Sequence, residues 1–377
     1  MRILHTGDLH LDSSFCAYGA RDAEKQREAG RDLLRRIFDC AKAEKCDMML
    51  IAGDLFDSRF VTPESAELFC KLVEECDIPV VLSPGNHDYY TEGGFYASCR
   101  SRLGDKLTVF SSSELQTYDF DELRVRVCGY AFTSPALLKS PLSDAEMPDD
   151  NGYLKILCAH ADLSSPVSRY APVTLSETER IGFDYVALGH IHNRDEREDA
   201  EGRVRYCGFA EGRSFDEIGE GGVWIVDLDG EACDARRILI SQRSFYCDEL
   251  DISEIGSHSA LLDALCGLAS SRAQSKGAHI RISLCGRAEE GYVRHAMLSV
   301  PRIVSDSGVD YIEIVDDTLP EIDGEYLKRD TTLRGELYRT LLPKLCSDDG
   351  NERRIATKAL RIGLAAIDGK SIFGASE

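Results

Sequence analysis

Residues 2–10 read RILHTGDLH, an apolar run that ends in an aspartate and a histidine. Four later segments follow the same plan, in which an apolar run leads to a small residue and then to Asp, Asn or His. Each run is rich in β-forming residues and long enough for one buried strand. The later segments are MMLIAGDLFD (48–57), VVLSPGNHD (80–88), LKILCAHAD (154–162) and VALGHIH (186–192). The chain is therefore predicted to hold five strands with polar side chains at their ends.

The polar residues at these strand ends are a mixture of carboxylate, amide and imidazole ligands. Carboxylates suit Mg and Mn, whereas imidazoles suit metals such as Fe, Mn, Co and Zn. A two-metal hydrolase needs such a mixed set, with one carboxylate shared between ions about 3.5–4 Å apart. The residues of the set are Asp8, His10, Asp54, Asn86, His160, His190 and His192. The pattern predicts a two-metal site that hydrolyses a phosphate ester.

The spacing of these residues suits extended backbone. Asp8 and His10 are two residues apart, as are His190 and His192, so each pair points to one side of a strand. A single histidine at a strand end is more often structural than a ligand, and the prediction depends on all seven residues together. Glycines that allow tight turns stand beside the ligands at Gly7, Gly53, Gly85 and Gly189.

In this order, GDLH, GDLFD, GNHD, AH and GHIH resemble the motifs of the calcineurin-like metallophosphoesterases. The segments RILHTGDLHLDSSF and YCGFAEGRSFDE are also similar to SbcD-type DNA repair exonucleases. The resemblance is good over residues 1–240 and weaker beyond them. It implies an α/β fold with a two-sheet β-sandwich flanked by helices, followed by a small α/β cap domain and a helical C-terminal tail. It also implies a two-metal phosphodiesterase that acts as an exonuclease on DNA ends.

The resemblance assigns roles to individual residues. It places one metal on Asp8, His10, Asp54 and His192, and the other on Asp54, Asn86, His160 and His190, with Asp54 as the bridge. The implied ions are two divalent metals, Mn first, with Fe, Mg, Co or Zn as alternatives. His87 is expected to reach the scissile phosphate and to protonate the leaving oxygen. Asp88 is expected to orient His87 or a neighbouring backbone turn. Asp57 stands where some relatives carry histidine, and it is expected to orient a ligand.

The composition predicts a fully folded cytoplasmic protein with no membrane partner. Hydrophobic residues make up 43% of the chain, and no apolar run reaches the eighteen or so residues of a membrane span. No signal peptide precedes the first predicted strand. The 14 cysteines are scattered singly, which favours small buried apolar residues over a disulfide framework.

The net charge of −22 has the wrong sign for a protein whose affinity rests on phosphate contacts. Two bound dications neutralise part of this charge. The acidic balance favours an alternative substrate, a small nucleotide or a phosphoprotein, whereas the cap-like segment and helical tail favour DNA. A third alternative is a non-catalytic scaffold with a vestigial site, although every ligand type and His87 are present.

The order of the predicted elements divides the chain into three parts. Helical spacing over residues 22–46 and 63–76 separates the first three strands, which predicts a parallel sheet with the ligands at the carboxyl ends of its strands. Residues 1–243 are expected to form the catalytic domain. Residues 244–319 are expected to form the α/β cap domain, and residues 320–377 a helical C-terminal region.

The resemblance implies that the cap domain helps to select the DNA strand, although a structural or dimerising role is an open alternative. In the C-terminal region, one apolar stripe is formed by Leu333, Leu337, Leu341 and Leu342. Such a stripe either packs on its own domain or binds a partner. Related nucleases use a comparable region to bind an SMC-like ATPase, so an ATPase subunit is an expected partner, together with DNA ends. A homodimer is also expected.

Overall fold

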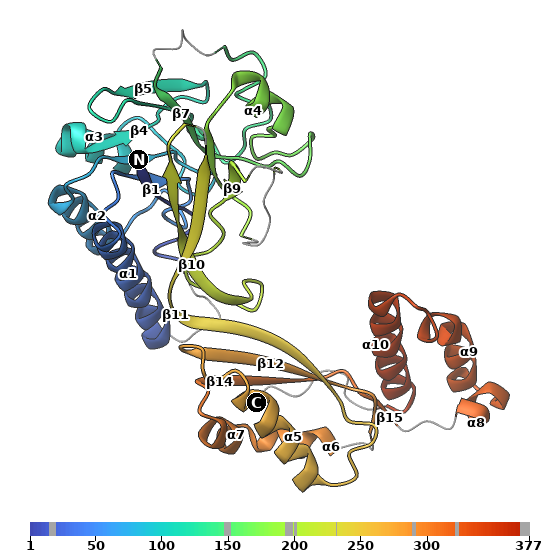
Figure 1. Ribbon diagram of the computed structural model, residues 1–377. Helices are drawn as coiled ribbons and strands as arrows, with labels where there is room; N and C mark the ends of the chain where they lie inside the picture. The colour runs from blue at the N-terminus through green and yellow to red at the C-terminus, as the bar shows by residue number, and fades with distance from the viewer. Residues whose placement is uncertain are drawn as a thin grey trace. The chain divides into compact units, whose positions relative to one another are not determined.

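The computed structural model describes residues 1–14, 20–146, 152–192, 199, 202–230, 232–288, 292–320 and 324–369. The last part of the predicted C-terminal region, residues 370–377, lies outside them. The chain divides into two compact units, which are Met1–Arg213 with Gly219–Gln242 and Ser214–Ile218 with Arg243–Glu377 (Figure 1). The predicted separation of residues 244–319 from 320–377 stays a prediction.

The first sheet of the first unit is built around a parallel core. In spatial order its strands are β11 (Cys233–Asp251), β10 (Gly219–Leu228), β1 (Arg2–Thr6), β2 (Met48–Ile51), β3 (Val80–Leu82) and β4 (Leu107–Val109). Strands β1 to β4 run parallel, and β10 pairs antiparallel with β1. Every residue of β2 and β3 is buried, as expected for parallel strands covered on both faces. Strand β11 continues beyond Gln242 into the second unit.

The second sheet is also mostly parallel. Its strands in spatial order are β5 (Gln116–Phe120), β6 (Val125–Gly129), β7 (Leu154–His160), β8 (Tyr185–Gly189) and β9 (Val204–Tyr206). Only β5 runs antiparallel to its neighbour. In the register of β7 and β8, His160 lies opposite Gly189, so these two strands end together.

A hydrophobic core joins the two sheets face to face. Ile3 and Leu50 from the first sheet pack with Ile156 and Ala187 from the second, and all four are fully buried. Burial of a large aliphatic side chain contributes about 1.5–3 kcal/mol, so this layer fixes the sandwich strongly.

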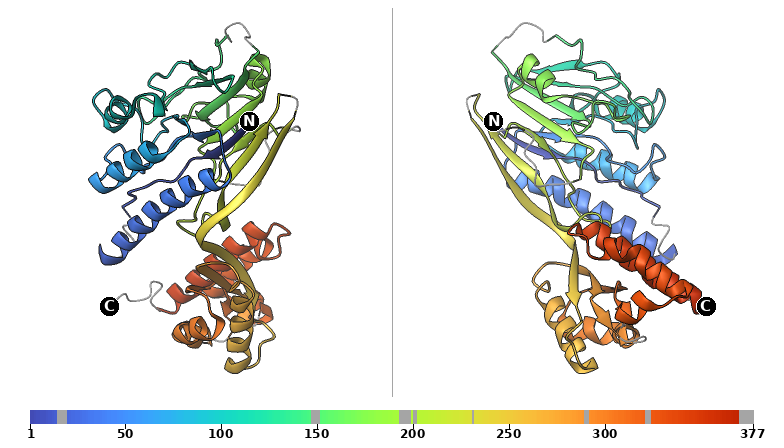
Figure 2. Two further views of the ribbon diagram at one scale, coloured as in Figure 1. Left: turned by 60° about the vertical axis from the view of Figure 1, so that its left-hand side comes forward. Right: turned by 90° about the vertical axis from the view of Figure 1, so that its right-hand side faces the viewer.

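Helices cover the outer faces of both sheets (Figure 2). The outer helices are α1 (Ala20–Ala43), α2 (Pro63–Glu75) and α3 (Phe95–Leu103), the last followed by a short 3-10 turn (Gly104–Lys106), and α4 (Leu175–Ile181). Leu34 and Phe69 pack on the first sheet, whereas Ile181 packs on the second. Helices α1 and α2 agree with the helical spacing of the sequence. The predicted two-sheet sandwich flanked by helices is confirmed.

The second unit contains a three-stranded parallel sheet with helices on one face. Its strands are β11 from Arg243 onward, β12 (Ala278–Cys285) and β14 (Tyr311–Asp316), and its helices are α5 (His258–Ser270), α6 (Tyr292–Leu298) and α7 (Val300–Ser307). Alternate residues of β12 are buried, and Ile280 and Ile282 pack with Leu265 of α5. The unit therefore follows the β-α-β-α-β pattern of the sequence.

The rest of the second unit is mainly helical. It comprises the short strands β13 (Arg287–Ala288) and β15 (Leu319–Pro320) and the helices α8 (Gly324–Arg329), α9 (Leu333–Leu345) and α10 (Gly350–Ile367). Helix α10 buries Leu360 and Leu364, and its Arg361 forms a 3.0 Å ion pair with Asp316. By contrast, Leu333 of the predicted apolar stripe is 68% exposed. Across the described ranges, no helix has the length and apolarity to cross a membrane.

Candidate metal centre

The predicted ligands lie where five strands end. Asp8 and His10 follow β1, Asp54 follows β2, Asn86 follows β3, His160 ends β7, and His190 and His192 follow β8. Strands β1 to β3 are parallel neighbours in one sheet, and β7 and β8 are parallel neighbours in the other. Open α/β sheets place their sites at the carboxyl ends of such strands.

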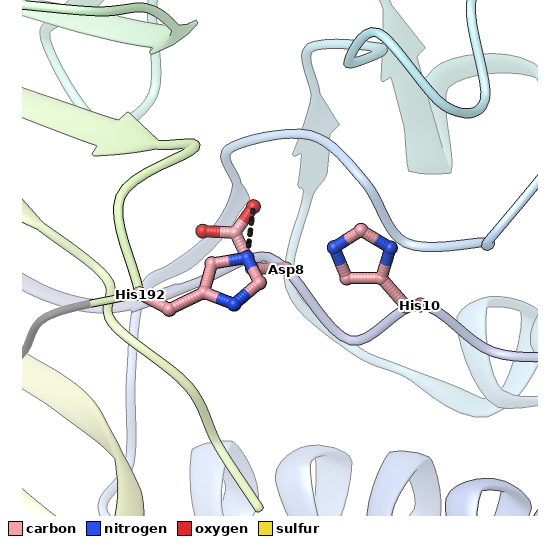
Figure 3. Close-up of side chains that lie close together, drawn as sticks. All are labelled: Asp8, His10 and His192. Carbon is pink, nitrogen blue, oxygen red and sulfur yellow. Dashed lines mark ion pairs between the residues drawn. The ribbon is translucent and has the colours of Figure 1, made fainter. Parts of the chain in front are cut away.

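Three groups of described side chains could hold a metal ion, with all donor atoms of a group within 4.8 Å of one another. The groups are Asp8 with His10 and His192, His10 with Asp54 and His87, and Asp8 with Asp54 and His160. Figure 3 shows the first group, in which His192 Nε2 is 3.9 Å from Asp8 Oδ1. Six side chains from both sheets therefore form one continuous cluster.

Asp54 lies at the centre of this cluster. Its Oδ2 atom is 3.4 Å from His160 Nε2 and 3.7 Å from His10 Nε2. The side chain of Asp54 is only 3% exposed, so its charge is held out of water. A buried carboxylate is costly unless a positive charge compensates it, and Asp54 contacts imidazoles from both sheets. Its role as the carboxylate shared between two ions stays a prediction.

The surroundings of His160 are suited to a cation. Its Nδ1 is 3.0 Å from the carbonyl oxygen of Ala52, which can only accept, so Nδ1 carries the proton. The other ring nitrogen, Nε2, lies 3.0 Å from Asn86 Oδ1. Asp54 Oδ2 also faces this nitrogen. Three atoms of the kinds that bind metal ions, one nitrogen and two oxygens, therefore converge at this point.

His10 gives a second, independent indication. Its Nδ1 pairs with Asp57 Oδ1 at 3.1 Å, and burial lowers the pKa of His10, which favours the neutral ring. Its Nε2 is buried and has no hydrogen-bond partner among the residues that the structure describes. A buried nitrogen without a partner costs free energy. An imidazole nitrogen is a common ligand of metal ions, and a metal ion bound at Nε2 would supply that partner. The nitrogen and oxygen donors of this centre therefore fit divalent ions.

His190 is brought near the cluster but is not a member of the three groups. Its ring centroid is 5.1 Å from that of His160 and 4.8 Å from that of Tyr170. Its backbone N–H lies 2.9 Å from Asp8 Oδ2 and 3.1 Å from Oδ1, so it donates to that carboxylate. Burial lowers the pKa of His190 to about 4, which keeps the ring in the neutral form that a metal requires.

His87 is the most exposed member of the cluster, with 44% of its side chain exposed. Its backbone N–H donates to Asp54 Oδ1 at 3.0 Å. Its Nδ1 donates to the carbonyl oxygen of Asp57 at 3.1 Å, which leaves Nε2 for another partner. Asp57 thus contacts two predicted site residues, because its carboxylate also holds His10.

Asp88 holds the backbone turn that carries Asn86 and His87. Its carboxylate accepts from the N–H groups of Gly85 at 2.8 Å and Phe56 at 3.1 Å, and from the hydroxyl of Tyr96. Burial and then the charge of Asp54 raise the pKa of Asp88 to about 6. These contacts connect the turn after β3 to the loop after β2.

Four of the predicted ligands adopt left-handed backbone conformations that non-glycine residues rarely use. The φ values are +51° at Asp8, +45° at His10, +46° at Asp54 and +103° at His190. Such conformations cost about 1–3 kcal/mol each and persist where the surrounding structure enforces them. This strain gathers at the cluster, as it commonly does at functional sites.

The structure adds three residues that the sequence did not assign to the site. The thiol of Cys207 donates to Asp8 Oδ2 at 3.2 Å, Arg213 Nη2 is 3.3 Å from His192 Nδ1, and Tyr96 donates to Asp88. Cys207 and Arg213 lie in YCGFAEGRSFDE, the segment similar to SbcD-type exonucleases. The similarity of that segment to SbcD-type exonucleases was the sequence signal for Cys207 and Arg213. The residue types in it do not reveal which predicted ligand either side chain contacts.

A two-sheet sandwich with these donors at its strand ends defines the class of metal-dependent phosphoesterases. The family model described as calcineurin-like phosphoesterase matches residues 1–194. The chain therefore belongs to the calcineurin-like phosphoesterase family, a family of hydrolases that use a dimetal site.

Three curated proteins are similar to the chain over part of their length. The uncharacterized metallophosphoesterase YhaO of Bacillus subtilis is 29% identical over 242 residues, which cover 60% of this chain and 57% of that protein. The DNA double-strand break repair protein Mre11 of Aeropyrum pernix is 28% identical over 278 residues, which cover 68% and 65%. A subunit of the nuclease SbcCD of Staphylococcus epidermidis is 23% identical over 263 residues, which cover 61% and 66%. The chain thus spans less than two thirds of each relative.

Proposed function

We propose that this chain is a two-metal phosphodiesterase, with Mn as its preferred metal, that acts as an exonuclease in DNA end processing and repair. The position of Asp54 carries the proposal, because one buried carboxylate contacts imidazoles from both sheets at 3.4 and 3.7 Å. Two similar proteins support DNA as the substrate, since one is named a DNA double-strand break repair protein and the other a nuclease subunit.

Asp54 would belong to the ligand sets of both ions. The residues that would hold one ion are Asp8, His10, Asp54 and His192, and those that would hold the other are Asp54, Asn86, His160 and His190. When bound, two divalent ions supply charge neutralisation at phosphorus and make water more acidic. The protein orients the ligands through Asp57, which holds His10, and through Cys207, which holds Asp8.

In this proposal His87 protonates the leaving oxygen. Its Nδ1–H is committed to the carbonyl oxygen of Asp57, so only Nε2 can carry the transferred proton. The Oδ1 atom of Asp57 also lies 3.8 Å from His87 Nδ1. Partial exposure of His87 leaves it accessible to a substrate.

Purified protein is expected to shorten an end-labelled linear DNA duplex stepwise in the presence of Mn. The near-isosteric Asp54→Asn variant removes the shared charge and is expected to abolish the shortening. A denaturing gel of timed samples makes the measurement, with bound metal quantified by mass spectrometry.

If the DNA stays intact while a small aryl phosphodiester is hydrolysed rapidly, the proposed exonuclease activity is contradicted. That result would favour a small nucleotide or a phosphoprotein as substrate, the alternative that the net charge of −22 supports. Two bound ions without turnover of either ester would favour the scaffold.

We also propose an SMC-like ATPase as a partner of the C-terminal helices. Helices α9 and α10 leave Leu333 68% exposed and Ile355 59% exposed, although α10 buries Leu360 and Leu364. Isolated exposed apolar residues are common, but each of these two side chains stands on a helix, and an apolar position on a helix suits a helical partner. The nuclease subunit among the similar proteins is named as part of a larger complex.

The double variant Leu333→Asp, Ile355→Asp is expected to lose this partner and to keep full hydrolysis of a small phosphodiester. A charged side chain at residue 333 or 355 opposes burial of that position against an apolar helix. Size-exclusion chromatography after coexpression with the SMC-type ATPase of the same genome measures the complex, and the same column tests the predicted homodimer. Leu298→Asp is the matched control, since Leu298 is 72% exposed on α6. Equal complex formation by both variants would contradict the partner surface.

A further inference from the structure

An exposed aromatic platform, defined by Arg59, Phe60 and Tyr89, lies in the loops that carry site residues. Phe60 is 75% exposed, which is unusual for a phenyl ring. The guanidinium carbon of Arg59 is 4.9 Å from the ring centroid of Phe60 and 5.7 Å from that of Tyr89. Arg59 therefore joins the two rings through cation–π contacts, and Phe60 remains largely open to a ligand.

Both ends of the platform are anchored beside His87. Phe60 is three residues after Asp57, whose carbonyl oxygen accepts from His87 Nδ1 at 3.1 Å. Tyr89 is two residues after His87 in the turn held by Asp88. The contacts of Arg59 therefore connect the loop that follows Asp57 with the turn that carries His87.

Local hydrogen bonds hold the Phe60 loop in place. The backbone N–H of Phe60 donates to Ser58 Oγ at 3.1 Å. Two residues further on, the N–H and hydroxyl of Thr62 both donate to Asp12 Oδ2, at 2.9 and 3.0 Å. These hydrogen bonds fix the loop that carries the exposed ring. Little conformational entropy of the loop is therefore lost when a ligand stacks on Phe60.

In the proposed reaction His87 protonates the leaving oxygen, so the leaving group lies on the His87 side of the centre. Aromatic side chains stack on nucleobases of any sequence, because every base has a π-face. We propose that Arg59, Phe60 and Tyr89 form the subsite for the leaving nucleoside, whose base stacks on Phe60. Because this subsite serves the proposed phosphodiesterase reaction, it rests on that function and names a nucleoside as the leaving group.

The test compares two phosphodiesters that differ only in whether the leaving ribose carries a base. The wild-type protein is expected to prefer the base-bearing ester by roughly tenfold or more in kcat/KM, the usual size of one base–aromatic stack. Phe60→Ala is expected to abolish this preference while kcat/KM for the abasic ester stays unchanged, and Phe60→Trp is expected to restore it. Leu239→Ala removes another apolar side chain, 55% exposed on β11, and is the matched control.

A binding measurement separates failure of the subsite from failure of the reaction. Calorimetry with the 3′ and 5′ isomers of adenosine monophosphate, and with the matching ribose phosphates, measures the preference for a base without turnover. A preference lost in Phe60→Ala supports the subsite even if no ester is hydrolysed. An equal preference in wild type and Phe60→Ala, or no binding of adenosine monophosphate, overturns the subsite. Hydrolysis of both esters at equal rates would do the same and leave the phosphodiesterase standing.

Discussion

The His87→Ala variant is expected to retain both metal ions and to lose about 10²–10⁴-fold in kcat, the usual contribution of a general acid. The Nδ1–H of His87 is bound to the carbonyl oxygen of Asp57, so the ring is oriented to use Nε2 on a substrate. Turnover of a phosphodiester with an alkyl leaving group measures the loss, and mass spectrometry measures the metal content. The loss is expected to shrink for a nitrophenyl leaving group, which departs without a proton.

The same variant decides between two roles for His87. One of its ring nitrogens lies with a ring nitrogen of His10 and a carboxylate oxygen of Asp54 in a group that could hold a metal. Loss of one ion from His87→Ala would make the residue a ligand and would contradict its role as an acid. An equal loss for both leaving groups would count against proton transfer. His258→Ala, an exposed histidine on α5, is the control for nonspecific metal binding.

The Gly85→Ala variant is expected to lose both ions and all measurable turnover while the fold survives. A Cβ atom at residue 85 would stand 2.2 Å from Asp54 Oδ1 and 2.7 Å from the Asp54 nitrogen. Since the backbone of Asp54 cannot yield easily, the shared carboxylate has to move. Overpacking of this kind costs about 1–3 kcal/mol, which a domain of this size can tolerate. Metal content, kcat and the circular dichroism spectrum make the comparison.

Gly256→Ala is the matched control, because a Cβ atom there meets nothing within 4 Å. It is expected to keep both ions and full activity. Two ions retained in Gly85→Ala would show that the Asp54 loop adjusts to the methyl group, and the contact at residue 85 would then not position the carboxylate. Loss of the fold would be seen in the spectrum and would separate a general defect from a local one.

Much of the fold could be predicted from the sequence because its signals are local. The runs that became β1, β2 and β3 each end in a ligand type, and helical spacing between them marked α1 and α2. Parallel strands joined by helices have to place their carboxyl ends at one edge of a sheet. In the second sheet, β7 and β8 are also parallel neighbours, and their carboxyl ends lie side by side.

The sequence by itself determined the residue types at the strand ends, the glycines beside them and the alternation of strands and helices. Only the tertiary structure decided which of those residues meet. The approach of Cys207 to Asp8 joins positions 199 residues apart, and Tyr96 reaches Asp88 from a helix on the outside of the sheet. Such contacts leave no periodic pattern in the chain, because they depend on the packing of the two sheets through their shared core and on loops held in strained conformations.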